Sequence, residues 1–471
     1  MLRFYNTLTQ KVEEFKPLNS PIVTMYICGP TVYDFFHVGN ARTFVLADVI
    51  RKYLEYKGFN VKFVMNLTDI DDKIIKKSNE EKISINEVAK KYTDAFFEDL
   101  KKLNIKEATL YPKATEHIED IINMIKSLVD KGFAYNVQGN VFYNVNKFNS
   151  YGKLSGKNID ELESGSRVEI NEIKKQPLDF ALWKKAKEGE PYWESPWGNG
   201  RPGWHIECSA MSCKHLGETF DIHAGGNDLI FPHHENEIAQ SEASTNKPFA
   251  KYWIHFGFLN INKEKMSKSL GNFFTAREVL EKFSPEAIRL FFLQAYYRGP
   301  LDFTDELLSA AEKGLEKIKN LQDKVTNELK KNNQNGKTPE FDFDDFEQRF
   351  NKVMDDDFNT SQAVSVIFDF IKEINKTIAE NTSLDVDFYK KINNFLETIA
   401  GSILGITKFK TVTDKPDSLL ENKLIELLID IRLKAKKEKN FLLADEIRDK
   451  LSGIGITLKD TKDGTDYFRN N

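Results

Sequence analysis

The feature that most constrains the fold is an apolar segment near the start of the chain, followed by a tight loop and an amphipathic helix. Residues Ile22–Ile27 are β-branched or apolar, and Cys28-Gly29-Pro30 ends the run, which is typical of a buried strand that meets a loop. Apolar residues then recur at helical spacing over residues 41–54, and residues 61–66 indicate a second strand. This strand–loop–helix–strand unit predicts a parallel α/β sheet.

The rest of the chain predicts a divided sheet followed by helices. Further strands are expected at residues 220–223 and near 252–256, so a long stretch, roughly 113–190, interrupts the sheet. That stretch predicts a helix at 118–131 and a short β segment near 141–146, which together suggest an inserted subdomain. From about Ser284 the pattern is helical, and the last piece, 420–468, predicts one basic helix and a short strand-like tail.

Composition excludes several classes of protein. The chain has 471 residues, which predicts two to four domains. No long uncharged apolar run indicates a transmembrane helix, and the N-terminus lacks a signal-peptide layout, so a cytoplasmic location is expected. Three cysteines are too few for a disulfide scaffold, and a net charge of −5 requires that any nucleic-acid contact use local basic faces. No coiled-coil pattern is present, so we expect a monomer.

Two short strings are typical of phosphate handling. His37-Val38-Gly39-Asn40 lies between a predicted strand and a predicted helix, where free N–H groups and the helix dipole favour an anion. Lys265-Met266-Ser267-Lys268-Ser269 places two lysines among small hydroxyl residues, which suits a polyphosphate. The alternatives are an ordinary turn and a solvated basic loop. Because the two strings belong to the same α/β unit, a nucleotide site is favoured.

Four scattered residues form a possible metal site: Cys28, Cys208, His233 and Glu237. His233 and Glu237 are four apart, so on a helix they share a face, and sulfur, imidazole and carboxylate are together a ligand set for zinc. The alternative is that each cysteine is a small buried hydrophobe. His234 and Cys213 are nearby alternates, and Cys213 is expected to be structural.

A glycine pair follows the strand expected at 220–223. Gly225-Gly226-Asn227-Asp228 suits contact with a ribose hydroxyl or an ammonium group at a strand end. The alternative is a strand-to-helix turn with a capping aspartate.

These residues resemble a known family. The strings at His37 and Lys265 look like the HIGH and KMSKS motifs of class I aminoacyl-tRNA synthetases, and the chain resembles the cysteinyl-tRNA synthetase family over nearly its whole length. The most specific stretches are residues 26–34, 66–73, 203–211, 231–237 and 354–360. Asn40 stands where the motif has its last histidine, so a role that needs an imidazole there is excluded, whereas its amide can still donate a hydrogen bond.

The resemblance implies an enzyme that activates L-cysteine with ATP and transfers it to the terminal adenosine of tRNA(Cys). It implies Zn²⁺ held by Cys28, Cys208, His233 and Glu237, and Mg²⁺ is expected on the ATP phosphates. His37 and Asn40 would hold ATP, and Lys265 and Lys268 would act on the departing phosphates. The remaining residues expected at the substrate site are Gly29, Thr31, Gly39, Thr68, Trp204, Gly226 and Asp228.

The resemblance also implies a domain order. A Rossmann-type catalytic domain is expected over 1–113 and 191–258, divided by a connective insertion over 114–190. The lysine loop and a stem-contact region follow over 259–310, then a helical bundle over 311–408 and an anticodon-binding subdomain over 409–471.

A zinc ion would explain how the enzyme discriminates cysteine from serine. An apolar pocket discriminates weakly between near-isosteres, whereas a soft metal binds a thiolate and not a hydroxyl. We therefore hypothesise that the substrate sulfur binds the zinc directly, and that Glu237 lengthens or yields to admit it.

The basic segment 432–439, with Lys434, Lys436, Lys437 and Lys439, is a candidate for contact with tRNA phosphates, the alternative being a solvated helix face. Tyr467 and Phe468 would stack on bases or pack the tail. The nearest rival function is an ATP-dependent ligase that joins cysteine to an amino sugar, although such a small acceptor needs no long helical region. A non-catalytic nucleic-acid-binding relative is a second rival, and His37 with both lysines argues against it.

Overall fold

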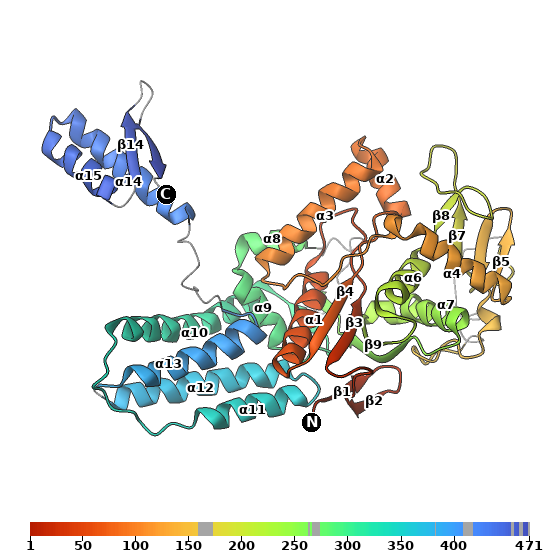
Figure 1. Ribbon diagram of the computed structural model, residues 1–471, viewed down its shortest axis with the longest axis horizontal. Coiled ribbons are helices and arrows are strands. Elements are labelled where there is room, and N and C mark those ends of the chain that lie inside the picture. Colours follow the sequence, from red (N-terminus) through yellow and green to blue (C-terminus); the bar gives the residue numbers. More distant parts are fainter. Residues whose placement is uncertain are drawn as a thin grey trace. The chain divides into compact units, whose positions relative to one another are not determined.

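The computed structural model describes residues 1–158, 173–261, 274–381, 383–407, 418–453, 456–460 and 465–469, together with a short strand at Glu264–Lys265. The chain divides into two compact units, Met1–Lys408 and Phe409–Asn471. The first unit contains all the residues expected in the nucleotide and metal sites (Figure 1).

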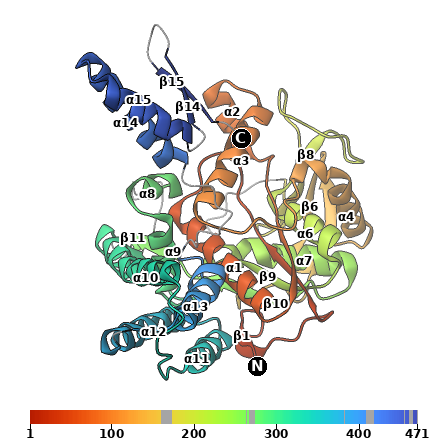
Figure 2. The same cartoon turned by 60° about the vertical axis from the view of Figure 1, so that its left-hand side comes forward.

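A four-stranded parallel sheet forms the centre of the first unit, as the sequence predicts. Its order is β10-β9-β3-β4, with bounds β3 (Ile22–Ile27), β4 (Asn60–Met65), β9 (Phe220–Gly226) and β10 (Ala250–Phe256). Helix α1 (Val38–Tyr56) covers one face, while α6 (Trp204–Leu216) and α7 (Glu235–Thr245) cover the other (Figure 2). Because both faces are covered, the strands are mostly apolar, and their carboxyl ends meet at one edge.

Helices and a second sheet separate β4 from β9. Helices α2 (Asp72–Glu81) and α3 (Ile85–Lys102) come first, followed by the short turn η1 (Ala114–Glu116) and α4 (Ile118–Asp130). An antiparallel sheet then runs in the order β5-β6-β7-β8, with bounds β5 (Ala134–Val137), β6 (Asn140–Tyr143), β7 (Phe180–Lys185) and β8 (Gly200–Pro202), and with η2 (Val145–Lys147) after β6. Strand β8 follows residue 190, at which we placed the end of the insertion; the domain boundaries stay predictions.

Sequence periodicity explains why α4 packs on this second sheet. Its residues Ile121, Ile125 and Leu128 repeat at helical spacing and are fully buried in one cluster with Trp183 of β7. A helix with one apolar face must bury that face against another element. The helix predicted at 118–131 is thus confirmed, and the β segment predicted near 141–146 corresponds to β6.

Three local predictions were wrong in their limits. Helix α1 begins at Val38 rather than at residue 41, because the His37 side chain caps it by accepting a hydrogen bond from the Asn40 amide. Strand β9 continues through Gly225 and Gly226, because both residues pair with β10, opposite His255 and Phe256. The C-terminal piece has two helices and a hairpin, because Lys439, with φ of 61°, breaks the predicted basic helix.

Helices form most of the remainder of the first unit. Strands β11 (Leu259–Ile261), β12 (Glu264–Lys265) and β13 (Leu301–Phe303) form a small sheet beside α8 (Ala276–Lys282) and α9 (Pro285–Leu293). A bundle follows, with α10 (Asp305–Lys331), α11 (Phe343–Asp355), α12 (Thr360–Glu380), α13 (Val386–Phe395) and η6 (Leu396–Ile403) (Figure 1). At the N-terminus, β1 (Arg3–Asn6) and β2 (Lys11–Glu14) form a hairpin. None of the helices in the described ranges is long and apolar enough to cross a membrane.

The second unit, Phe409–Asn471, has a small core of its own. Helices α14 (Ser418–Lys437) and α15 (Phe441–Gly453) are followed by the hairpin β14 (Ile456–Asp460) and β15 (Thr465–Arg469). Ile425, Ile429, Leu451 and Ile456 are buried together. Arg432 is 2% exposed, so it belongs to the interior of this unit rather than to the basic surface predicted over 432–439.

One buried ion pair joins the sheet domain to the helices that follow it. Arg289 of α9 and Asp48 of α1 are at most 1% exposed and lie 2.8 Å apart. The same guanidinium donates to the carbonyl oxygens of Leu103 and Leu404, at 3.0 and 2.9 Å. Every charge and donor here is therefore partnered, which burial requires.

Replacing Arg289 with methionine should destabilise the first unit by about 3 kcal/mol, the low end for breaking a buried ion pair. The low end applies because Lys52 also contacts Asp48, at 2.8 Å. Urea unfolding measures the effect. The matched control is Arg349→Met, which breaks an exposed pair with Asp369 and should change stability by less than about 1 kcal/mol. Equal decreases in the free energy of unfolding in the two variants would contradict the prediction.

Candidate functional site

The start of α1 forms one wall of the candidate site. His37 is extended, and its Nδ1 accepts a hydrogen bond from the Asn40 amide at 3.1 Å. In a neutral ring this arrangement leaves the proton on Nε2, so His37 can donate from that atom. The glycine at position 39 and the first-turn amides of α1 provide the close approach and positive dipole that a phosphate needs.

A cavity of about 360 Å³ lies beside this helix start, at the carboxyl edge of the central sheet. It brings together nine residues that the sequence analysis named, namely Cys28, Gly29, Thr31, His37, Gly39, Asn40, Trp204, Gly226 and Asp228. The cavity thus joins a predicted phosphate site to one of the predicted metal ligands. Ligands of open α/β sheets bind at this edge.

Thr68 differs from the other predicted pocket residues. It is 1% exposed and lies outside the described cavity lining. Its hydroxyl donates to Glu207 at 3.0 Å, and its backbone pairs with Thr31 and Val32. Thr68 therefore stabilises the loop after β3 through backbone hydrogen bonds.

The sequence analysis missed several residues that line the cavity. Tyr33, Asp34 and Lys73 are among them, and the Lys73 ammonium lies 5.3 Å from the centre of the Tyr33 ring. All three belong to stretches that we singled out for their resemblance to the family, 26–34 and 66–73. That resemblance was the signal that could have identified them. Phe256 and Leu259 also line the cavity and carried no such signal.

Of the two lysines in the predicted phosphate loop, Lys268 lies outside the described residues. Lys265 is described only by its backbone, which pairs with Asn260 across β11 and β12. The far end of the loop is described again at Phe274, whose carbonyl accepts from the Val38 amide at 3.0 Å. The loop therefore returns to the start of α1.

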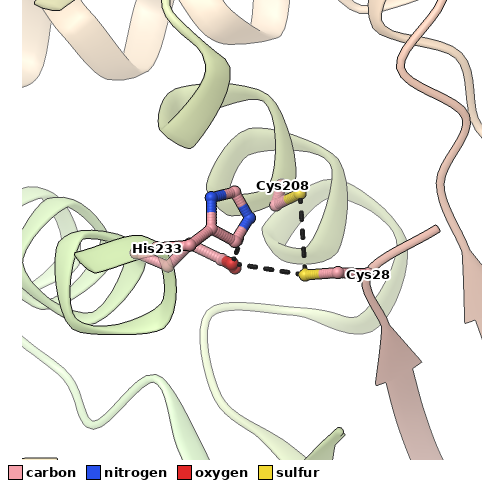
Figure 3. Close-up of side chains that lie close together, drawn as sticks. Cys28, Cys208 and His233 are labelled. Atoms are coloured by element: carbon pink, nitrogen blue, oxygen red, sulfur yellow. Dashed lines mark hydrogen bonds and ion pairs between the residues drawn. The ribbon is translucent and has the colours of Figure 1, made fainter. Parts of the chain in front are cut away.

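The four predicted metal ligands lie together, fully or nearly fully buried, and Figure 3 shows how Cys28, Cys208 and His233 point toward one another. Cys28 Sγ is 3.9 Å from Cys208 Sγ and 3.4 Å from Glu237 Oε1. His233 Nε2 is 3.0 Å from the same carboxylate oxygen. Cys28 comes from the end of β3, Cys208 from α6, and His233 from the short η4 segment (Ile230–His234) that leads into α7. The sheet edge and two helices thus converge on one point.

The electrostatics of this cluster favour the anionic form of Glu237 and Cys208, whereas burial raises the pKa of the Cys28 thiol well above its ordinary value. Burial tends to raise the pKa of Glu237, but His223 and His233 beside it hold that pKa well below its ordinary value. The hydrogen bond from Cys28 opposes burial and lowers the pKa of Cys208 to about 6. A carboxylate and a thiolate are the protonation states in which these groups bind a metal.

A second set of donors overlaps the first. Cys28, His223, His234 and Glu237 also lie close enough together to hold an ion. The sequence analysis named His234 as an alternate and missed His223, which lies in β9 with no motif to mark it. Cys213 belongs to neither set, and burial raises its pKa to about 12, in keeping with its predicted structural role.

Neighbouring side chains orient the first set. His223 Nε2 contacts Glu237 Oε2 at 2.9 Å, and His205 Nδ1 contacts His233 Nδ1 at 2.9 Å. Each contact leaves one ligand atom directed at the cluster, as the outer partners of metal ligands commonly do. The Trp204 ring stacks on His233 with 4.1 Å between ring centres, so a cavity residue touches a predicted ligand.

Comparison with known proteins agrees with this geometry. The model of the family described as "tRNA synthetases class I (C) catalytic domain" matches residues 14–313, and the one described as "DALR domain" matches residues 349–409. The chain belongs to the class I tRNA synthetases. A Clostridioides difficile protein named "Cysteine--tRNA ligase" is 52% identical over 473 residues, which cover 99% of this chain and 100% of that relative. One from Carboxydothermus hydrogenoformans with the same name is 51% identical over 488 residues, with the same coverage. The predicted resemblance is confirmed.

Solved structures share the fold. A Mycobacterium tuberculosis methionyl-tRNA synthetase in complex with methionyl-adenylate has a TM-score of 0.59 at 15% identity, covering 81% of this chain and 89% of that one. An Agrobacterium radiobacter LeuRS in a ternary complex with tRNA has a TM-score of 0.61 at 9% identity, covering 83% of this chain and 85% of that one. At these identities the likeness concerns the fold alone.

Gly29 should tolerate no side chain. A Cβ atom there would lie 1.8 Å from the carbonyl oxygen of Asn66, and overpacking against backbone typically costs about 1–3 kcal/mol. We therefore expect Gly29→Ala to lower the melting temperature measured by circular dichroism. In Gly314→Ala, on helix α10, the new Cβ would lie 3.3 Å from the Phe368 ring, and the gain in helix propensity should leave the melting temperature unchanged or raised. A wild-type melting temperature for Gly29→Ala would show that the two strand ends are not in contact.

Proposed function

We propose that this protein is a cysteine–tRNA ligase, which activates L-cysteine with ATP and transfers it to tRNA(Cys). The observation that carries the proposal is that one cavity is lined both by Cys28, with three further buried donors behind it, and by the start of α1. A sulfur-binding site and a phosphate-binding site within one cavity suit an amino acid with a thiol and a nucleotide. The names of the two relatives agree with this substrate pair.

Zinc is the metal that best fits the donor set of Cys28, Cys208, His233 and Glu237. The two sulfurs are soft donors, the imidazole is borderline and the carboxylate is hard, a mixture that borderline-soft Zn²⁺ accepts, and all four donors are buried. This set is favoured over the one with His223 and His234, because in it His223 and His205 are the outer partners that orient the ligands. When bound, zinc would supply a soft Lewis acid that takes the sulfur of cysteine as a thiolate and discriminates against the hydroxyl of serine.

In the first reaction the cysteine carboxylate attacks the α-phosphate of ATP. A bond forms between a carboxylate oxygen and that phosphorus, the bond to the β-phosphate oxygen breaks, and pyrophosphate leaves with Mg²⁺ as counter-ion. His37 Nε2, the side-chain amide of Asn40 and the first turn of α1 hold the nucleotide phosphates. Lys265 and Lys268 neutralise the charge on the departing pyrophosphate.

The amino acid is held between the metal ligands and the sheet edge. Asp228 lies in the short turn η3 (Asn227–Leu229), directly after β9, and lines the cavity. Its carboxylate is the acceptor that we assign to the substrate ammonium group. Trp204, 39% exposed over His233, would cover the substrate side chain and exclude water from it.

In the second reaction the cysteinyl group passes from AMP to a ribose hydroxyl of the terminal adenosine of tRNA. We assign binding of the tRNA backbone to the second unit. Its side chains Lys434, Lys437 and Lys439 are exposed and can pair with phosphates. The side chains of Tyr467 and Phe468, named as possible stacking groups, lie outside the described residues. A monomeric, cytoplasmic enzyme stays a prediction.

Labelling of the acceptor tests the proposed function most directly. Protein supplied with ATP, radioactive cysteine and total tRNA should label tRNA, whereas amino sugars offered in place of tRNA should stay unlabelled. Labelling of an amino sugar instead would establish the rival ligase. The match to the DALR domain at residues 349–409 and the full-length coverage of tRNA ligases favour tRNA. A protein that labels neither would be the non-catalytic relative.

Metal content tests the donor set. Wild-type protein should contain about one zinc per chain by atomic emission, because four donors complete a tetrahedral shell. Cys208→Ser should lose most of that zinc, since it replaces a soft ligand with a hydroxyl. Cys213→Ser, a matched control on the same helix, should keep it. Equal zinc content in the two variants would exclude Cys208 as a ligand.

Lys268→Ala should lower ATP–pyrophosphate exchange by about 100-fold or more, because it removes a charge that acts on the leaving group. Binding of cysteine, followed by titration calorimetry, should change little. Lys282→Ala, at the end of α8, removes a lysine outside the predicted loop and should keep wild-type exchange. A wild-type exchange rate in Lys268→Ala would show that this lysine is dispensable.

A further inference from the structure

Arg42 links the start of α1 to a turn that is distant in sequence. It is 1% exposed and lies two residues after Asn40. Its Nη1 donates to the carbonyl oxygens of Gly257 and Phe258 at 2.8 and 2.9 Å, at the end of β10. Its Nη2 donates to those of Tyr296 and Gly299 at 3.3 and 2.8 Å. One guanidinium therefore fastens two backbone segments to α1.

These two segments also contact each other closely. The Gly257 amide donates to the Tyr297 carbonyl at 2.8 Å, and a Cβ on Gly257 would lie 2.1 Å from the Gly299 carbonyl oxygen. The contact continues as a parallel pairing of β11 with β13, in which Leu259 faces Leu301. We call residues 296–299 the anchor turn. Because there is no room for a side chain between this turn and the chain that enters strand β11, each holds the other in place.

Strand β11 leads directly into the predicted phosphate loop that contains Lys265 and Lys268, here called the lysine loop. It pairs with β12, which contains Lys265, and Lys268 follows three residues later. At the far end of the loop, the Ala276 amide donates to the Phe36 carbonyl at 2.9 Å. Both ends of the loop are thus attached to the region of α1 that we assign to the ATP phosphates, and Arg42 provides the attachment at the entering end.

The helical part of the protein holds the anchor turn from its other side. Asp357, 4% exposed, lies between α11 and α12. It accepts hydrogen bonds from the hydroxyls of Tyr296 and Tyr297, the latter at 2.6 Å, and contacts Arg298 at 2.9 Å. These three partners belong to the anchor turn, and the Tyr5 amide of β1 donates to the same carboxylate at 2.7 Å. Asp357 therefore holds the side chains of the turn, whereas Arg42 holds its backbone.

The backbone at Asp357 is itself unusual. Asp357 and Phe358 have φ values of 62° and 48°, a left-handed conformation that is unfavourable for non-glycine residues. Phe358 is fully buried and stacks on Phe4, with 5.2 Å between ring centres. Such a conformation persists only where surrounding contacts determine it, as the contacts of Asp357 and Phe358 do here.

We propose that Arg42 and Asp357 are positioning residues for the adenylation step, which clamp the anchor turn and thereby fix strand β11, where the lysine loop begins, relative to the start of α1. The inference rests on the phosphate role proposed for Lys265 and Lys268. Neither Arg42 nor Asp357 lines the cavity, so each acts through the backbone that it holds. The stretch 354–360 then has a role in the chemistry of the first step and not only in joining helices.

The test is steady-state ATP–pyrophosphate exchange with the full-length, metal-loaded protein, varying ATP and cysteine separately. In Arg42→Lys a single ammonium cannot reach four carbonyl oxygens, and in Asp357→Asn the carboxylate charge that pairs with Arg298 is lost. In each variant kcat/KM for ATP should fall about 10- to 100-fold, because a displacement of about 1 Å at the reacting groups has an effect of that size. The KM for cysteine should stay within about twofold of the wild-type value. Tyr296→Phe, which removes one hydroxyl and leaves the carbonyl in place, should shift kcat/KM for ATP in the same direction by less.

Two matched variants control for general loss of structure. Arg51→Lys alters an arginine of the same helix that is 5% exposed and donates to the Lys106 and Glu107 carbonyls, away from the anchor turn. Asp369→Asn breaks the exposed pair with Arg349 in the helical bundle. Both should keep the wild-type kcat/KM for ATP, and thermal melting of every variant checks that it is folded.

The outcomes distinguish a failure of the clamp, meaning the positioning role of Arg42 and Asp357, from a failure of the proposed function. If Arg42→Lys and Asp357→Asn fold and have wild-type ATP parameters while Lys268→Ala loses exchange, the clamp is wrong and the lysine role stands. An equal fall in kcat/KM for ATP in Arg51→Lys would also overturn the clamp. If Lys268→Ala keeps wild-type exchange, the phosphate role of that lysine is wrong, and the clamp is wrong with it.

Discussion

The buried carboxylate of Glu237 is the interaction around which the site is arranged. An ionised group without exposure to water must be paired, and Glu237 is paired with His223 at 2.9 Å and His233 at 3.0 Å, with Cys28 at 3.4 Å. An apolar core would fill this space at lower free-energy cost, since buried ion pairs contribute little net stability. A dense group of buried imidazoles, thiols and a carboxylate therefore supports the proposed metal site over a role in folding alone.

Close backbone contacts place the proposed nucleotide site beside this group. Gly29 lets the end of β3 meet Asn66 at the end of β4, and Gly225 lets β9 approach the His234 ring. At the opposite wall, Gly257 lets the end of β10 touch the anchor turn. Each glycine stands where a Cβ atom would collide with a neighbouring residue. The cavity between these walls owes its shape to backbone contacts, which hold sulfur-binding and phosphate-binding groups at fixed separation.

The sequence predicted the sheet and the donor set because both depend on local patterns or on a family resemblance. The apolar run of β3 and the spacing of His233 and Glu237 could be read directly. Contacts over long sequence distances could not be read in this way: His223 is one more residue of a strand, and Arg42 and Asp357 are 315 positions apart with no pattern that relates them. The position of Thr68 could not be read either, because a polar residue after a strand gives no indication of whether it faces the cavity or, as here, donates to Glu207.

The central claim is that the buried donors select cysteine by its sulfur atom. The direct measurement is ATP–pyrophosphate exchange by the zinc-loaded protein, with cysteine and with serine as the amino acid. If the sulfur is recognised by a soft metal, kcat/KM for serine should be lower than that for cysteine by a factor of about 10,000 or more, as for sites that read one specific atom of the substrate. A difference of only about 100-fold, which an apolar pocket gives between near-isosteres, would contradict the claim.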